Sequence, residues 1–274
     1  MNDRLPGKGR ELPAGRRRRS APETRDPFSL TGQTALVTGA RSGIGAAVAV
    51  GLARAGANLV LLGRRDDLDD TAQAARGCGS VVETSAVDLS RPSQTETAVR
   101  ELLARRRVDV LVNNAGVIER GPAEEVDFAS WRAVHAVNLD AAFLLARECG
   151  AEMIKRGSGK IVNIASLLSF QGGVDVAAYA SSKHALAGMT KALANEWARH
   201  GVQVNAVAPG YIATDNTAPL RADALREASI RKRIPAGRWG SPEDVVGATV
   251  FLASSAADYV NGHVLVVDGG WMAR

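Results

Sequence analysis

A glycine-rich turn between an apolar strand and a helix constrains this chain more than any other stretch. Residues 33–38 are apolar with β-branched side chains, which predicts a buried strand. Gly39, Gly43 and Gly45 follow as G-x-x-x-G-x-G, and the Ala-rich run 46–55 predicts a helix. Missing side chains let the backbone approach a pyrophosphate, to which the helix N-terminus offers N–H donors. A simple tight turn is the alternative, and the strand–turn–helix context favours dinucleotide binding.

The alternation of strands and helices continues along the rest of the chain. Six further apolar runs predict strands, at residues 58–62, 80–86, 108–112, 160–166, 202–208 and 263–267. Helical patterns separate them, which is typical of right-handed β-α-β units and a parallel sheet. We therefore predict a single-domain, doubly wound α/β Rossmann fold for residues 28–274, with seven parallel strands and helices on both faces.

Charge and cysteine usage limit the classes of partner. Residues 1–26 carry +4 of the chain's net charge of +5, and few of them are apolar. We expect residues 1–27 to form a disordered basic arm, and the nearly neutral remainder argues against a nucleic-acid partner. No apolar run approaches the roughly 20 residues that span a bilayer, and no secretory signal is present. Cys78 and Cys149 make no disulfide framework, so we predict a cytoplasmic protein without a membrane partner.

The end of the second predicted strand is the segment that reads the adenosine ribose in a dinucleotide fold. Gly63 and Arg64 lie about 20 residues after the glycine turn, where an acid binds the 2′-hydroxyl of NAD and an arginine accepts the 2′-phosphate of NADP. Arg64, together with Arg41 in the glycine turn, favours NADP(H), because arginine grips phosphate through a bidentate fork. NAD(H) stays open through Asp66 or Asp67, as does a surface role for both arginines.

A tyrosine and a lysine form a candidate acid/base pair. Tyr179 and Lys183 are four residues apart in the run 177–199, which predicts a helix because it is rich in Ala and Leu and lacks Pro. A free tyrosine has a pKa of about 10, and a lysine cation nearby lowers it. The pair is suited to moving an alcohol proton. A half-buried tyrosine beside a solvated lysine is the alternative for this spacing alone.

Five motifs together resemble the short-chain dehydrogenase/reductase family. They are the glycine turn, Asn113-Asn-Ala-Gly116, Asn138, Ser166 and Tyr179-x-x-x-Lys183, in the family's order and spacing. The resemblance covers residues 28–274 and implies a sheet of strand order 3-2-1-4-5-6-7, no separate substrate domain, and a homotetramer. Because ligands bind beyond the carboxyl ends of parallel strands, we expect the motifs to line one edge of the sheet.

The resemblance implies a catalytic role for Asn138, Ser166, Tyr179 and Lys183. Ser166 would hold the substrate oxygen, and Tyr179 would take the alcohol proton on oxidation or give one on reduction. Lys183 would lower the pKa of Tyr179 and bind the nicotinamide ribose, and Asn138 would hold a water that links Lys183 to solvent. For Ser166 alone a strand-end cap is the alternative, and for Asn138 alone a satisfied polar group within a helix.

The resemblance also implies the contacts of the dinucleotide. They lie in the glycine turn, after the second, third and fourth strands, on the catalytic helix and on the loop after the sixth strand. These residues are Gly39, Arg41, Ser42, Gly43, Ile44, Gly45, Gly63, Arg64, Asp88, Leu89, Asn114, Ala115, Gly116, Tyr179, Lys183, Pro209, Gly210, Ile212 and Thr214. Residues 215–234, polar and helical in pattern, are expected to form a mobile substrate lid.

The chain also resembles the sugar-acid branch of the family, the 2-deoxy-D-gluconate 3-dehydrogenases and gluconate 5-dehydrogenases. The residues that carry this resemblance are 169–173, 195–198, 208–217, 234–240, 259–262 and 267–274. A sugar acid implies a cation in the pocket, because burying an unpaired carboxylate is costly. Arg120 and Arg238 are the candidate cations and Gln171 a candidate for a sugar hydroxyl, with surface roles as the alternative. Trp271 and Met272 are expected to reach a neighbouring subunit's pocket.

Three functions stay open. The first is an NADP(H)-dependent oxidoreductase that interconverts a secondary alcohol and a ketone on a sugar acid. The second has the same mechanism on another carbonyl, such as a 3-oxoacyl thioester or a small ketone. The third is a non-catalytic nucleotide-binding or nucleic-acid-binding protein, and the complete set of Asn138, Ser166, Tyr179 and Lys183 argues against it.

Overall fold

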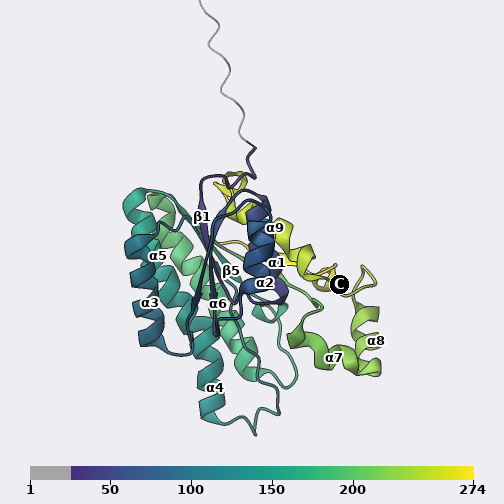
Figure 1. The fold of residues 1–274 in the computed structure, drawn as a ribbon. Coiled ribbons are helices and arrows are strands. Elements are labelled where there is room, and N and C mark those ends of the chain that lie inside the picture. The colour runs from purple at the N-terminus through teal and green to yellow at the C-terminus, as the bar shows by residue number, and fades with distance from the viewer. Residues whose placement is uncertain (1–25) are drawn as a thin grey trace, which may run out of the picture.

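A computed structural model of the chain describes residues 26–274 (Figure 1). The predicted basic arm, residues 1–27, lies outside this range except for its last two residues. The described chain alternates strands and helices, and its sheet is enclosed between two layers of helices. None of the helices between residues 26 and 274 has the length and apolar character needed to cross a bilayer.

The sheet has seven strands, all parallel, in the order β3-β2-β1-β4-β5-β6-β7. The strands are β1 (Thr34–Thr38), β2 (Asn58–Gly63), β3 (Val82–Ala86), β4 (Val110–Asn113), β5 (Gly159–Ile164), β6 (Val202–Pro209) and β7 (Val264–Val267). The central strands are buried on both faces, which explains why they read as continuous apolar runs. The predicted fold class and strand order are confirmed.

Two sets of helices cover the two faces of the sheet (Figure 1). One face packs against α1 (Gly43–Arg54), α2 (Asp69–Arg76) and α9 (Val246–Ala253), whose apolar residues share one core with β1 and β2. The other face packs against α3 (Pro92–Arg105), α5 (Ala141–Arg156) and α6 (Ala177–Trp197) through a second core. Short 3₁₀ turns lie at Leu167–Ser169, Ala198–His200, Asp215–Thr217, Pro242–Val245, Ser255–Ala257 and Trp271–Ala273.

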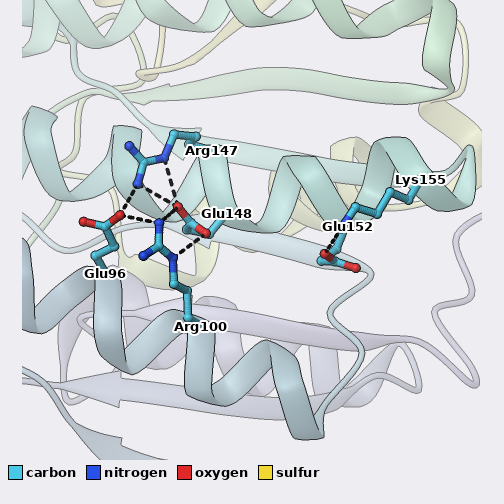
Figure 2. A network of polar contacts seen from close by, with 6 residues as sticks. All are labelled: Glu96, Arg100, Arg147, Glu148, Glu152 and Lys155. Atoms are coloured by element: carbon cyan, nitrogen blue, oxygen red, sulfur yellow. Dashed lines mark hydrogen bonds and ion pairs between the residues drawn. The ribbon is translucent and has the colours of Figure 1, made fainter.

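Ion pairs join α3 to α5 on the outside of the second layer (Figure 2). Arg147 donates to Glu96 (2.7 Å) and to Glu148 (2.6 Å), and Arg100 donates to Glu148 (3.1 Å). The hydrogen bond from Arg100 is the main cause that holds the pKa of Glu148 below its ordinary value. Every cation of this cluster therefore has a carboxylate partner.

The predicted helix around Asn138 is interrupted in the structure. The helix α4 (Phe128–His135) runs through a π-helical segment, Ala136–Asp140, into α5. A π-helical turn shifts the register of the following side chains, and such turns are frequent at functional sites. Asn138 lies within this segment and is buried.

The segment after β6 projects beyond the carboxyl edge of the sheet. Its helices are α7 (Ala218–Ala222) and α8 (Ala224–Arg233), which lie beside each other away from the layers (Figure 1). Asp223 separates them, since its side chain accepts from the backbone N–H groups of Leu225 and Arg226 and so starts a new helix. Ile230 is the one residue of α8 that is buried.

Candidate active site

The glycine turn and the Asn114 loop lock together at the end of β1. Thr38 Oγ1 accepts from the backbone N–H groups of Asn114 (3.0 Å) and Ala115 (2.9 Å), and Asn114 Nδ2 donates to Thr38 O (2.9 Å). Gly39 has φ of 64°, a left-handed conformation that glycine adopts without strain. A Cβ on Gly45 would press into Gly39 O and Asn114 Nδ2. The turn is therefore packed so closely that a side chain at Gly45 is excluded.

A groove of about 330 Å³ extends from this turn along the carboxyl edge of the sheet. Most of the residues expected to contact a dinucleotide line it, namely Gly39, Arg41, Ser42, Gly43, Ile44, Gly45, Asn114, Ala115, Gly116, Tyr179, Lys183, Pro209, Gly210, Ile212 and Thr214. Ile164, Ala165, Asp215, Asn216 and Thr217 also line it, and sequence reasoning missed them. Apolar strand residues and a turn at the start of the predicted lid carry no signal of their own for binding.

The four other residues expected at the dinucleotide lie outside this groove. Gly63 ends β2, and its carbonyl accepts from Val87 N at 2.8 Å, next to Asp88 and Leu89. Arg64 is exposed, and its charge is among the causes that keep the pKa of Asp88 low, after hydrogen bonds from Ser90 and the charge of Arg91. Gly63 and Arg64 thus lie at the end of β2 and Asp88 and Leu89 lie just after β3, the two strands on one side of β1 in the sheet.

Arg41 stands at the rim of the groove between two acids. Its Nε lies 3.7 Å from Asp67 Oδ2, and its Nη2 lies 4.0 Å from Asp215 Oδ2. All three side chains are well exposed, so the pairs are weak and screened by solvent. The guanidinium of Arg41 can therefore exchange these weak pairs for a doubly charged anion such as a phosphate.

Tyr179 and Lys183 face one another on the first turns of α6. The ammonium nitrogen of Lys183 lies 5.6 Å from the centroid of the Tyr179 ring and donates to Ile164 O at 2.7 Å. Lys183 is 3% exposed, and this burial lowers its pKa to about 8. Lys183 is therefore mostly protonated at neutral pH, and a small fraction of it is neutral.

Burial also dominates the titration of Tyr179. Desolvation raises the pKa of this phenol, and the hydrogen bond with Ser166 and the charge of Arg120 oppose that increase. We expected Lys183 to lower this pKa, and burial of the phenol is instead its largest influence. The hydroxyl of Ser166 accepts from Leu168 N at 3.1 Å and caps a 3₁₀ turn, and its role in holding the substrate oxygen stays a prediction.

Asn138 fixes the loop that follows β4. Its Oδ1 accepts from Val117 N (2.8 Å), and its Nδ2 donates to Val117 O (3.0 Å) and to Ser182 Oγ (3.1 Å). A Cβ on Gly116 would lie 3.4 Å from Asn138 Oδ1 and 3.7 Å from Lys183 Nζ, so these groups meet at one point. The side chain is fully used in these contacts, and the water-holding role of Asn138 stays a prediction.

A second cavity, of about 350 Å³, shares Ser166, Tyr179, Pro209 and Gly210 with the groove. Arg120 and Gln171, two of the expected substrate contacts, line it. Sequence reasoning missed the other cations and the aromatic wall of this cavity, namely Arg226, Arg233, Tyr211 and Trp271. Positions 226 and 233 are seven apart on α8, which places them on one helix face, and that spacing was the available signal.

The three arginines of this cavity have no carboxylate partner among residues 26–274. Arg120 donates to the backbone carbonyl of Asn216 at 3.2 Å, and no aspartate or glutamate lines the cavity. Arg226 and Arg233 lie within 4.0 Å of no acidic oxygen in the described chain. The cavity is therefore positively charged, and an anion would find unused donors there.

Arg238 and Trp271 lie elsewhere than the sequence suggested. Arg238 makes two hydrogen bonds to Asp244 (2.7 and 2.9 Å), so its charge is already paired, and it is not among the residues that line the cavity. Trp271 was expected to reach a neighbouring subunit. The structure places it in the cavity of its own chain, 4% exposed, because the C-terminal turn folds back under β6 and α8.

Known proteins share this fold and most of this sequence. A family model described as enoyl-(acyl carrier protein) reductase matches residues 39–272. A relative from Bacillus subtilis, named 2-dehydro-3-deoxy-D-gluconate 5-dehydrogenase, is 53% identical over 249 residues, which are 91% of this chain and 98% of the relative. The chain belongs to the short-chain dehydrogenase/reductase family. It is an NAD(P)-dependent oxidoreductase of that family, so the resemblance noted from the motifs is confirmed.

Two solved structures extend the comparison to bound ligands. A Beutenbergia cavernae protein, crystallised with NADP at low occupancy, is 59% identical with a TM-score of 0.89 and covers 91% of this chain and 100% of its own. A gluconate 5-dehydrogenase from Burkholderia cenocepacia, in complex with NADP and tartrate, is 41% identical with a TM-score of 0.87 and covers 91% of this chain and 98% of its own.

Proposed function

We propose that this chain is an NADP(H)-dependent oxidoreductase that interconverts a secondary alcohol and a ketone on a sugar acid. One observation carries the proposal: three arginines without carboxylate partners line a cavity that includes Ser166 and Tyr179. The Bacillus subtilis relative and the Burkholderia cenocepacia structure are both named for C5 of a gluconate-type acid, which supports that position on a six-carbon chain.

The groove fits a dinucleotide by its shape and by its donors. Gly39, Gly43 and Gly45 line it without side chains, and the N-terminus of α1 opens onto it with backbone N–H groups. The pyrophosphate would lie against Gly43 and Ile44, and the nicotinamide end near Ile212 and Lys183. Bound NADP(H) supplies the hydride for reduction or accepts it in oxidation.

The residues of the chain bind the substrate and move the proton. Ser166 would donate to the substrate oxygen and hold it beside Tyr179, since both side chains line the cavity and the groove. Tyr179 would take the hydroxyl proton in oxidation and return it in reduction, and protonated Lys183 would favour the phenolate. Gln171 would bond a sugar hydroxyl, and Arg120 would face the polar part of the substrate.

The cofactor choice rests on two arginines. Arg64 follows β2 without an acid at the ribose position, and Arg41 stands at the rim of the groove. Arg64→Ala should weaken NADPH about tenfold or more and leave NADH within about twofold, because only NADPH carries the 2′-phosphate. Dissociation constants from the quenching of protein fluorescence test this, and equal losses for both cofactors would show that Arg64 reads no phosphate.

The substrate assignment has a direct test. Cofactor reduction at 340 nm is followed with D-gluconate and 2-deoxy-D-gluconate, and NADPH oxidation with 5-keto-D-gluconate and 2,5-diketo-3-deoxy-D-gluconate. Activity with D-gluconate and 5-keto-D-gluconate, and none with 2-deoxy-D-gluconate, would support the 5-dehydrogenase type. Turnover of an acetoacetyl thioester or a small ketone, with every sugar acid inert, would favour the alternative carbonyl substrates instead.

The proposal includes the cytoplasm as compartment and a homotetramer as assembly. The free thiols of Cys78 and Cys149 are compatible with a reducing compartment. Light scattering of the purified protein measures the assembly, and a mass four times the 28.7 kDa of one chain is expected. A monomeric mass with full activity would contradict the tetramer.

A further inference from the structure

An aromatic cluster closes the substrate cavity on the side of the lid. The ring centroids of Tyr211 and Trp271 are 4.6 Å apart, and that of Trp239 lies 5.4 Å from Tyr211. The three rings come from the loop after β6, the loop after α8 and the C-terminal turn, so they join three segments that are distant in sequence. The cluster gives this end of the cavity a rigid wall.

Trp271 is the fixed member of this wall. Its turn is held by Asp268, whose carboxylate accepts from Gly270 N (2.8 Å) and Met272 N (2.8 Å). The indole packs with buried residues of the lid and of the 3₁₀ turn after Ser166, namely Leu167, Ile230 and Ile234. The buried indole nitrogen, a hydrogen-bond donor, has no acceptor among residues 26–274. A residue that is firmly placed thus keeps one polar group unused at the cavity.

Arg233 lies flat on this platform. Its guanidinium carbon is 4.0 Å from the centroid of the Trp271 ring, within the range of a cation–π contact. Such a contact uses the face of the guanidinium and leaves the N–H groups at its edge free for a planar anion. Arg231, two positions earlier on α8, differs, because it is paired with Glu227 at 2.8 Å. The structure therefore holds Arg233 in place without neutralising it.

Two of the three cavity cations come from α8. Arg233 lies against Trp271, and Arg226 is seven positions earlier on the same face of the helix. Arg120 comes from the loop after β4 and donates to Asn216 O at 3.2 Å. Burial raises the pKa of Tyr211 in the aromatic wall, and the charges of Arg226, Arg233 and Arg120 oppose that shift.

We propose that Arg226 and Arg233, the latter held against Trp271, bind the carboxylate of the substrate at the aromatic wall of the cavity. This inference rests on the proposed function, since it assigns the acid group of the sugar acid to named residues. Tyr179 lines the same cavity of about 350 Å³, so one substrate would place its carboxylate at the two arginines and its reacting hydroxyl at Tyr179.

The test compares an acid with its neutral counterpart on the same carbon skeleton. We expect Arg233→Ala to lower kcat/KM for D-gluconate about 100-fold and to leave kcat/KM for D-gluconamide within threefold, because the amide has no charge to lose. Arg226→Ala should act in the same direction. Arg231→Ala is the matched control on α8 and should keep wild-type values with both substrates, since Arg231 is paired with Glu227 and does not line the cavity.

Trp271 is tested separately as a positioning residue. Trp271→Leu removes the aromatic face and should raise KM for D-gluconate about tenfold with kcat nearly unchanged. Trp271→Phe keeps a ring and should recover most of that loss.

Equal losses for acid and amide in Arg233→Ala, or full activity on the acid, would overturn the inference.

A binding measurement separates this inference from the proposed function. Calorimetric titration of the Tyr179→Phe protein, loaded with NADP, with D-gluconate needs no turnover. If the wild-type protein turns over no sugar acid, the proposed function fails. Gluconate binding that is lost with Arg233→Ala would still support the carboxylate site, and absence of binding would overturn it as well.

Discussion

The arginines on the outside of α3 and α5 and the arginines of the substrate cavity differ in what neutralises them. Arg100 and Arg147 share the carboxylates of Glu96 and Glu148 (Figure 2), so their charge is satisfied within the chain. Arg120, Arg226 and Arg233 line the cavity, where Arg120 contacts a carbonyl and Arg233 an indole ring. The paired cations join two helices. The unpaired ones leave donors for a ligand, and the contrast distinguishes a structural charge from a functional one.

Tyr179→Phe should cause the largest loss of activity among these variants, larger than the loss from removing any arginine of the cavity. The variant keeps the ring and the three arginines and removes the proton donor, so we expect kcat to fall by about 10³ or more, with NADPH binding unchanged. Steady-state turnover and the NADPH dissociation constant test this. Turnover within tenfold of wild type would show that the proton passes through another group.

Lys183 is a buried cation whose hydrogen-bond partner is a backbone carbonyl, Ile164 O. Burial lowers its pKa from 10.5 to about 8, so between these pH values the unfolded chain keeps a proton that the folded chain has released. Raising the pH through this window should therefore stabilise the fold, by about 3 kcal/mol. Urea unfolding at both pH values should show that Lys183→Met lacks this increase. Lys155→Met, an exposed lysine on α5, serves as the control and should retain it.

Arg120→Ala tests whether an arginine of the cavity influences the pKa of Tyr179. The cation favours the phenolate, so its removal should raise the pKa of Tyr179 and move the alkaline rise of oxidation activity to higher pH. We expect kcat/KM for D-gluconate at pH 7 to fall about tenfold as a result. Arg120→Lys keeps the charge and should keep the pH profile. An unshifted profile in the alanine variant would mean that Arg120 does not influence Tyr179.

Arg147→Ala should give the smallest effect, and on stability alone. It leaves Glu148 with Arg100 as its remaining partner at this half-exposed site, so the free energy of unfolding should fall by about 1 kcal/mol. The difference should shrink in 1 M salt, where the Debye length is about 3 Å. Activity on D-gluconate should match wild type. A loss of activity would show that the paired arginines of α3 and α5 also affect the reaction, as the arginines of the cavity are expected to do.

The sequence alone determined the sheet, the glycine turn and the spacing of the Tyr179 and Lys183 pair. Buried parallel strands read as apolar runs, and the close contact of Gly45 with Asn114 admits only glycine, so both features leave local patterns. Tyr179 and Lys183 are one helical turn apart, and helix geometry fixes such a pair wherever the helix lies. Strands, glycine turns and pairs on one helix face depend on residues that are close together in the sequence, so they can be predicted from the sequence.

Only the tertiary structure decided which cations line the cavity beside Tyr179. Arg120, Arg226 and Arg233 come from the loop after β4 and from α8, and they meet because the lid folds over the carboxyl edge of the sheet. Arg238 looked equivalent in the sequence, and its charge is taken by Asp244 six residues on. Trp271 is placed by a C-terminal turn that packs under the lid. Whether an arginine is free or paired depends on contacts between distant segments, and a one-dimensional pattern holds no record of them.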